Sequence, residues 1–152
     1  MQQYKFDLCA EYHQFHLQDE QADADVALES YSDEAFSNGA ALMPGKIFVL
    51  TASDMYVPVV IEVQDSTPDE SFDEWDKVFE CSVDVPSGKI VVAGGCTDEW
   101  DEAERIEVAP GTYRARIYYG DLDKLSEDEL EGDDHYKVTL WPAPQAEPIR
   151  LK

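Results

Sequence analysis

Carboxylates are the residues of this sequence whose number and spacing could carry chemistry. The chain has 34 Asp and Glu against 11 Lys and Arg, which gives a formal net charge of −23. Most of these acids gather in four segments between expected strands, at 19–25, 65–76, 98–104 and 121–134. Such rows of carboxylates can imitate the phosphates of a nucleic acid and occupy a basic cleft of another protein. The alternative is a solvated rim that only prevents aggregation.

Two of the acidic segments also carry a tryptophan, Trp75 and Trp100. Aromatic residues are enriched in the cores of protein interfaces, so both could anchor a partner. Alternatively, each could anchor its own loop to the protein, because large aromatic side chains are mostly buried. The sequence predicts partner binding by these residues: Asp69, Glu70, Asp73, Glu74, Trp75, Asp98, Glu99, Trp100, Asp101 and Glu102.

No metal site is expected. The segment that begins at Asp121 starts like a calcium-binding loop, but Ser126 stands where that loop needs glycine and Gly132 where it needs a bidentate glutamate. His13 and His16 are three residues apart on an expected strand, so their side chains point to opposite faces. His13 is expected to be a hydrogen-bonded histidine at the edge of the core.

Nothing in the sequence supports catalysis, and we predict no catalytic residue and no cofactor. The nucleophile motif G-x-S-x-G is absent, and no phosphate-binding loop follows Gly94 and Gly95. Cys9, Cys81 and Cys96 lie on or beside expected strands and are interpreted as small core hydrophobes.

Composition narrows the class of protein and of partner. Three widely spaced cysteines argue against a disulfide scaffold, and no C-x-x-C suggests structural zinc. The first residues do not resemble a signal peptide, and no run of about 18 apolar residues could span a membrane, so a cytoplasmic location is expected. A net charge of −23 repels nucleic acids and anionic membranes and favours a basic protein partner.

Alternating apolar and polar residues predict strands along most of the chain. The apolar phase switches between Tyr4–Leu8 and Phe15–Leu17, which suggests a bulge near Ala10. Pro86–Gly88 suggests a hairpin between its two flanking strands. Further strands are expected at 26–31, 47–52, 56–63, 79–85, 89–93, 106–108, 112–119 and 136–140.

Helix is expected in short pieces only. Ser32 can cap a helix over 33–37 that Asn38 and Gly39 end, and a second helical turn is expected within 126–130. About seven to nine strands with turns between them predict an all-β antiparallel sandwich. We expect one domain over residues 1–152, with less than about 15% helix.

Several short motifs resemble the competence protein J family, which inhibits a bacterial nuclease of DNA uptake. The best of them is Tyr12-His13-Gln14-Phe15, and the similarity is clearest over residues 8–52. The other motifs are Ser32-Asp33-Glu34-Ala35, Gly39-Ala40-Ala41, Ala109-Pro110-Gly111-Thr112-Tyr113 and a last strand near 136–141. The long acidic segments 65–76 and 121–134 depart from the family. The resemblance implies a small inhibitor that binds a nuclease, and it assigns no contact residue.

Two hypotheses of function follow. The first is an acidic inhibitor that docks on a basic nuclease-like protein and blocks its nucleic-acid-binding surface. The second is a non-enzymatic β-sandwich binding module for a small ligand, a peptide, a sugar or a cation. A concave apolar pocket with a few polar groups would favour the second, and a continuous acidic face would favour the first.

Overall fold

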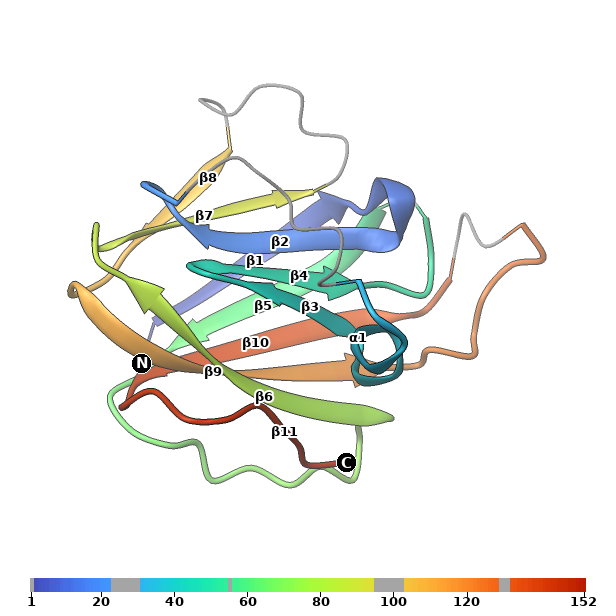
Figure 1. The fold of residues 1–152 in the computed structure, drawn as a ribbon. Coiled ribbons are helices and arrows are strands. Elements are labelled where there is room, and N and C mark those ends of the chain that lie inside the picture. The colour runs from blue at the N-terminus through green and yellow to red at the C-terminus, as the bar shows by residue number, and fades with distance from the viewer. Residues whose placement is uncertain (1, 23–30, 55, 95–102, 129–131) are drawn as a thin grey trace.

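Two β-sheets pack face to face in the computed structural model, which describes residues 2–22, 31–54, 56–94, 103–128 and 132–152 (Figure 1). One sheet has the strand order β1 (Gln2–Cys9), β5 (Tyr56–Val63), β10 (His135–Pro142), β9 (Gly111–Gly120), β6 (Lys77–Val85) and β11 (Ile149–Arg150). The other has the order β3 (Ala40–Met43), β4 (Lys46–Leu50), β2 (Gln14–Asp19), β7 (Lys89–Gly94) and β8 (Glu104–Glu107). The expected all-β sandwich is therefore confirmed.

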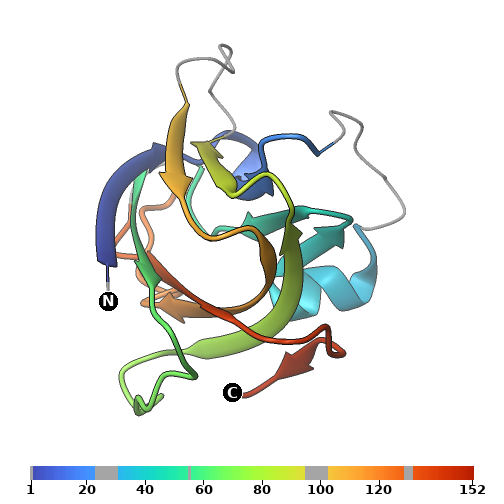
Figure 2. The same cartoon turned by 90° about the vertical axis from the view of Figure 1, so that its left-hand side faces the viewer.

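The core lies between the sheets because each strand turns its apolar residues inward. In β6, Phe79, Cys81 and Val83 are buried in the core while Glu80 and Asp84 alternate with them on the outer face. The inward residues of β5, β9 and β10 join the same cluster. In the view of Figure 2, the ribbons of the two sheets curve around a common interior.

The helix predicted at Ser32 is confirmed. It is α1 (Asp33–Asn38), where the Ser32 hydroxyl accepts a hydrogen bond from the Ala35 backbone N–H at 3.1 Å. Gly39 ends it in the left-handed conformation at φ 85°. A 3-10 turn, η1 (Glu11–His13), is the other helical element of the described chain, so helix is as scarce as expected. The second turn expected at 126–130 is not helical in its described residues, 126–128.

The structure corrects two local predictions. The phase switch near Ala10 is no bulge, because β1 belongs to one sheet and β2 to the other, and η1 carries the chain across. Pro86–Gly88 likewise joins strands of different sheets, so β6 and β7 form no hairpin. In both places a tight turn leads the chain across the sandwich, which a turn motif does not distinguish from a hairpin.

Pairing between strands is antiparallel with one exception, since β10 runs parallel to β5. No pattern in the sequence predicted β3 or the two-residue β11, and with them the described residues form eleven strands. The strand expected at 26–31 falls almost wholly on residues outside the described ranges. No helix of the described chain is long and apolar enough to cross a membrane.

Candidate functional site

The acidic segment 65–76 lies along the outer face of the six-stranded sheet and is fastened to it by two cations. The guanidinium of Arg116 donates to the Pro68 carbonyl at 3.3 Å and lies 5.5 Å and 5.3 Å from the ring centres of Phe72 and Trp141. The Lys137 ammonium donates to Glu70 at 2.6 Å. Of the predicted partner-binding acids in this segment, Glu70 thus has an internal partner, while Asp69, Asp73 and Glu74 are exposed.

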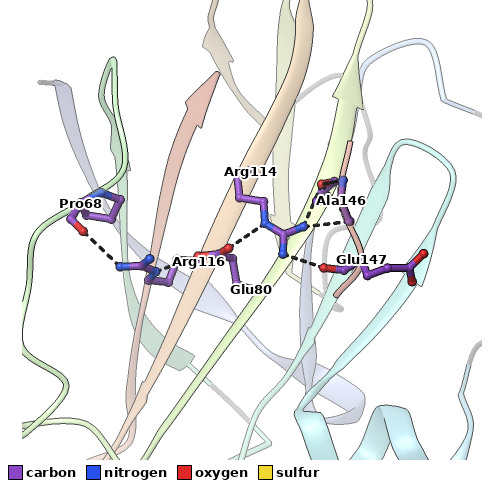
Figure 3. Close-up of polar contacts among 7 residues, drawn as sticks. Pro68, Glu80, Arg114, Arg116, Ala146 and Glu147 are labelled. Atoms are coloured by element: carbon purple, nitrogen blue, oxygen red, sulfur yellow. Dashed lines mark hydrogen bonds and ion pairs between the residues drawn. The ribbon is translucent and has the colours of Figure 1, made fainter. Parts of the chain in front are cut away.

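A half-buried carboxylate, that of Glu80, organises the same face. Glu80 accepts from Arg114 at 2.7 Å and from Arg116 at 3.0 Å (Figure 3). Arg114 also donates to the carbonyls of Ala146 and Glu147, which holds the C-terminal segment against β6 (Figure 3). The charged groups of this network bond to one another and to backbone carbonyls of the same chain. They therefore stabilise the fold around the acidic segment and are not available to bind a ligand.

Trp75 anchors its own loop, the alternative stated for it above. Its half-buried ring lies 5.3 Å from the ring of Tyr118 and 5.2 Å from that of His135. The Lys137 ammonium is 5.7 Å from the same ring. The other five predicted partner-binding residues, Asp98, Glu99, Trp100, Asp101 and Glu102, lie outside the described residues.

The second and fourth acidic segments meet at one end of the sandwich. The Leu122 N–H donates to the Asp76 carboxylate at 2.9 Å, and the Asp76 N–H donates to the Tyr119 carbonyl at 2.8 Å. This brings Asp76 beside Asp121 and Asp123. At the edge of the third segment, Arg105 instead pairs with Glu20 of the first at 2.9 Å.

A pocket of about 560 Å³ opens at the end where the second and fourth segments meet. Its aromatic and apolar walls are Tyr12, Tyr31, Phe36, Leu50, Tyr119 and Leu122, and its polar groups include His13, Gln14, Thr51 and Lys77. Its size is typical of ligand sites, which measure roughly 300–1,000 Å³. The turn η1, α1 and the ends of β4 and β9 that supply these residues lie together on the right of Figure 1.

The backbone of the pocket's edge is unusual. Tyr12 and His13 both have positive φ, 63° and 58°, which side chains other than glycine rarely adopt. Hydrogen bonds hold them there: the His13 N–H donates to Asp54 at 3.1 Å, and the His13 ring faces the Thr51 and Ala52 carbonyls at 3.3 and 3.1 Å. His13 is thus a hydrogen-bonded, half-buried residue, as predicted, and its neighbour Tyr12 is held outward with 77% of its surface exposed.

Lys77 is the cation of the pocket wall. Its ammonium lies 5.1 Å from the centre of the Tyr119 ring. Burial first, and then the charge of Arg150, lowers the pKa of Lys77 from its ordinary value. The Tyr119 hydroxyl donates to the Gly39 carbonyl at 2.6 Å, and burial holds its pKa well above the ordinary value. Among the described residues that line the pocket there are several groups suited to binding and no carboxylate or thiol.

The cysteines differ from one another. Cys81 is a free thiol in the core, as predicted, and burial raises its pKa to about 12, so it is unreactive at neutral pH. Cys9 is disulfide-bonded, so its interpretation as a plain core hydrophobe is wrong. Disulfides in a β-protein join residues that are close in space and distant in sequence, which spacing does not reveal. Cys96 lies outside the described ranges.

Metal binding finds no support in the part of the chain that the structure describes. No three His, Cys, Asp or Glu side chains are grouped there to hold an ion. Lys124 and His135 flank Asp121, at 3.2 and 3.8 Å from its carboxylate oxygens.

Comparison with solved structures shows that proteins of known structure have a similar fold. The crystal structure of ComJ from Bacillus subtilis, described as an inhibitor of the DNA-degrading activity of NucA, superimposes with a TM-score of 0.66. The match covers 94% of this chain and 96% of ComJ at 16% sequence identity. The chain has the fold of ComJ. The resemblance to the competence protein J family is thereby confirmed at the level of the fold.

A second solved structure shares the ComJ fold. The product of crocagin biosynthetic gene J superimposes with a TM-score of 0.62 and 18% identity, over 95% of this chain and 100% of that one. No protein-family model matches the chain. A sequence search of curated proteins also finds no match. Tyr12, His13 and Gln14, which belong to the best of the motifs that resemble the competence protein J family, line the pocket.

Proposed function

We propose that the chain is an inhibitor that docks on a basic nuclease-like protein and blocks its nucleic-acid-binding surface. The observation that carries this is the combination of the ComJ fold with a net charge of −23. ComJ is described as an inhibitor of a DNA-degrading activity. A surface with this charge competes with nucleic acid for a basic cleft, because both present rows of anions at short spacing.

The proposed inhibitor acts by occupying a surface and needs no catalysis. The exposed acids of the loops steer a basic partner at long range, and apolar contacts hold it after encounter. Asp69, Asp73 and Glu74 belong to this acidic surface because their carboxylates face solvent beside the fastened Glu70. The acids and tryptophan at 98–102 are the second part of the proposed surface.

The test measures plasmid degradation by non-specific DNA nucleases, with NucA as the first. Near-equimolar chain should slow degradation at low salt, and salt should weaken the effect because screening shortens electrostatic reach. Changing Asp69, Asp73 and Glu74 together to amides should weaken inhibition more than the same change at the exposed Asp7, Glu107 and Glu147, which lie outside the four acidic segments. Undiminished DNA degradation by every nuclease in the presence of excess chain would overturn the proposal.

A binding module for a small ligand is the second candidate function, and the pocket is the observation that favours it. Aromatic walls with a few polar groups, among them Lys77 and Gln14, are typical of small-molecule sites. The experiment in the next subsection separates the two candidates.

A further inference from the structure

We infer that the pocket between η1 and α1 receives an apolar side chain from a basic segment of the partner. This inference rests on the proposed function and deepens it, because it assigns the apolar anchor of the interface to the pocket. The sequence had assigned that role to Trp75 and Trp100. The Trp75 ring already lies against Tyr118 and His135, whereas the pocket is open.

Exposed aromatic surface is concentrated at this pocket. Four large hydrophobic residues of the described chain are strongly exposed, and two of them, Tyr12 at 77% and Phe36 at 60%, line the pocket. They come from different elements, η1 and α1. A contiguous apolar surface at the mouth of a concavity costs solubility and is typical of an interaction site.

The backbone holds Tyr12 in place before any partner arrives. The two consecutive left-handed residues, Tyr12 and His13, are kept by bonds to Asp54, Thr51 and Ala52. Backbone strain of this kind persists where the surrounding structure fixes it and is concentrated at binding sites. A preformed pocket edge loses little conformational freedom on association, which favours its use as an anchor.

The charges around the pocket select a basic occupant. Asp54 accepts a hydrogen bond from the His13 N–H and Asp76 accepts one from the Leu122 N–H. Asp121 and Asp123 flank Leu122 in the sequence, so four carboxylates adjoin the lining residues, of which Asp121 also pairs with Lys124. Lys77 is the opposing charge in the wall, and it lies against the Tyr119 ring. In the proposed complex, one apolar side chain of the partner fits among the aromatic rings of the pocket. The partner's cationic residues on either side of that side chain then contact the four carboxylates.

The test uses an acetylated peptide in which one tryptophan is flanked on each side by lysines. Binding to the full chain is followed by the amide shifts of the isotope-labelled protein at low salt. The tryptophan peptide should shift Tyr12, Phe36 and Leu122 and bind more tightly than its alanine counterpart. Tyr12→Ala and Phe36→Ala should each weaken it about fivefold, because each truncation removes apolar area that the tryptophan would bury. Tyr56→Ala is the matched control, because Tyr56 is 61% exposed and does not line the pocket.

Three results would overturn the inference. Equal affinity for the tryptophan and alanine peptides, or no binding of either, would leave no role for an apolar anchor. Affinity unchanged by Tyr12→Ala and Phe36→Ala would place the peptide elsewhere. Tighter binding of indole-3-acetate than of the tryptophan peptide would assign the pocket to small anions that pair with Lys77. The peptide measurement requires no nuclease, so its failure is distinct from a failure of nuclease inhibition.

Discussion

Tyr12 combines an exposed aromatic ring with a left-handed backbone, and each of these costs stability. A residue with a β-carbon loses roughly 1–2 kcal/mol in that conformation relative to one without. Such a position is retained where it serves binding, because the same backbone is more stable with glycine. Substitution of Tyr12 can therefore test whether stability is lost at this position in favour of binding.

We predict that Tyr12→Gly raises the free energy of unfolding by about 1 kcal/mol, because glycine adopts positive φ without strain. The same change should weaken binding of the tryptophan peptide. Urea denaturation measures the first effect. Tyr12→Ala is the control, since it keeps the β-carbon and should not stabilise the fold. A Tyr12→Gly variant less stable than Tyr12→Ala would contradict the argument.

His16 makes the stability of the fold depend on pH. Its ring stacks on Phe48 at 5.0 Å, and burial, assisted by the charge of Lys46, lowers its pKa from 6.5 to about 4. The unfolded chain binds the proton more tightly, so the folded state loses stability as pH falls from about 6.5 to about 4. This group alone should account for about 1–3 kcal/mol over that window.

The measurement compares urea denaturation of the natural chain and of His16→Gln at neutral and mildly acidic pH. Protonation of the many carboxylates affects both proteins alike, so the difference between them isolates the histidine. Stability of the natural chain should fall relative to the variant as the pH is lowered. Parallel pH profiles would show that the ring is solvated.

At the scale of the elements, the alternation of apolar and polar residues predicts which face of a strand is buried. It does not predict to which sheet the strand belongs or with which strand it pairs. In β6, the alternating residues Phe79, Cys81, Val83 and Val85 are buried, as their phase in the sequence predicts. The crossings at Ala10 and at Pro86–Gly88 were missed because strand pairing depends on contacts distant in sequence. β3 was missed because Ala40–Met43 is too short and too uniformly apolar to show a period.

The inner face of β5 gives the prediction at this scale. Val59 and Ile61 are 1% and 0% exposed, so Val59→Ala or Ile61→Ala should lower the free energy of unfolding by about 2–4 kcal/mol. Val60 between them is half-buried on the outer face. Val60→Ala should cost less, and chemical denaturation of the three variants compares them. A loss below about 0.5 kcal/mol at Val59 would be inconsistent with close packing there.

At the scale of the molecule, the net charge follows from the composition, and the all-β class could be predicted from the two-residue alternation of apolar and polar residues. The pocket could not be predicted. Its wall draws on residues from Tyr12 to Leu122, and only the strand topology brings them together. Three residues of the best motif of the family resemblance, Tyr12-His13-Gln14-Phe15, line the pocket, but nothing in the motif itself indicated a pocket.

Charge and pocket should control different steps of association with a nuclease partner. Neutralising Asp98, Glu99, Asp101 and Glu102 to amides should slow association and flatten its salt dependence, because exposed charges act by steering that salt screens over about 8–10 Å. Tyr12→Ala should instead speed dissociation and leave the association rate unchanged, since an apolar anchor acts after encounter.

Surface plasmon resonance at several salt concentrations measures both rates. Because like charges repel within one segment, the neutralised variant should also keep or gain stability, which excludes unfolding as the cause of slower association. An association rate unchanged by neutralisation would assign the 98–102 acids to solubility alone.

The corresponding change at Asp69, Asp73 and Glu74 then tests the segment 65–76, whose end adjoins the pocket. We expect this segment to have the larger effect, because Asp76 fastens it to Leu122 at the pocket wall and its charges therefore act where the partner docks.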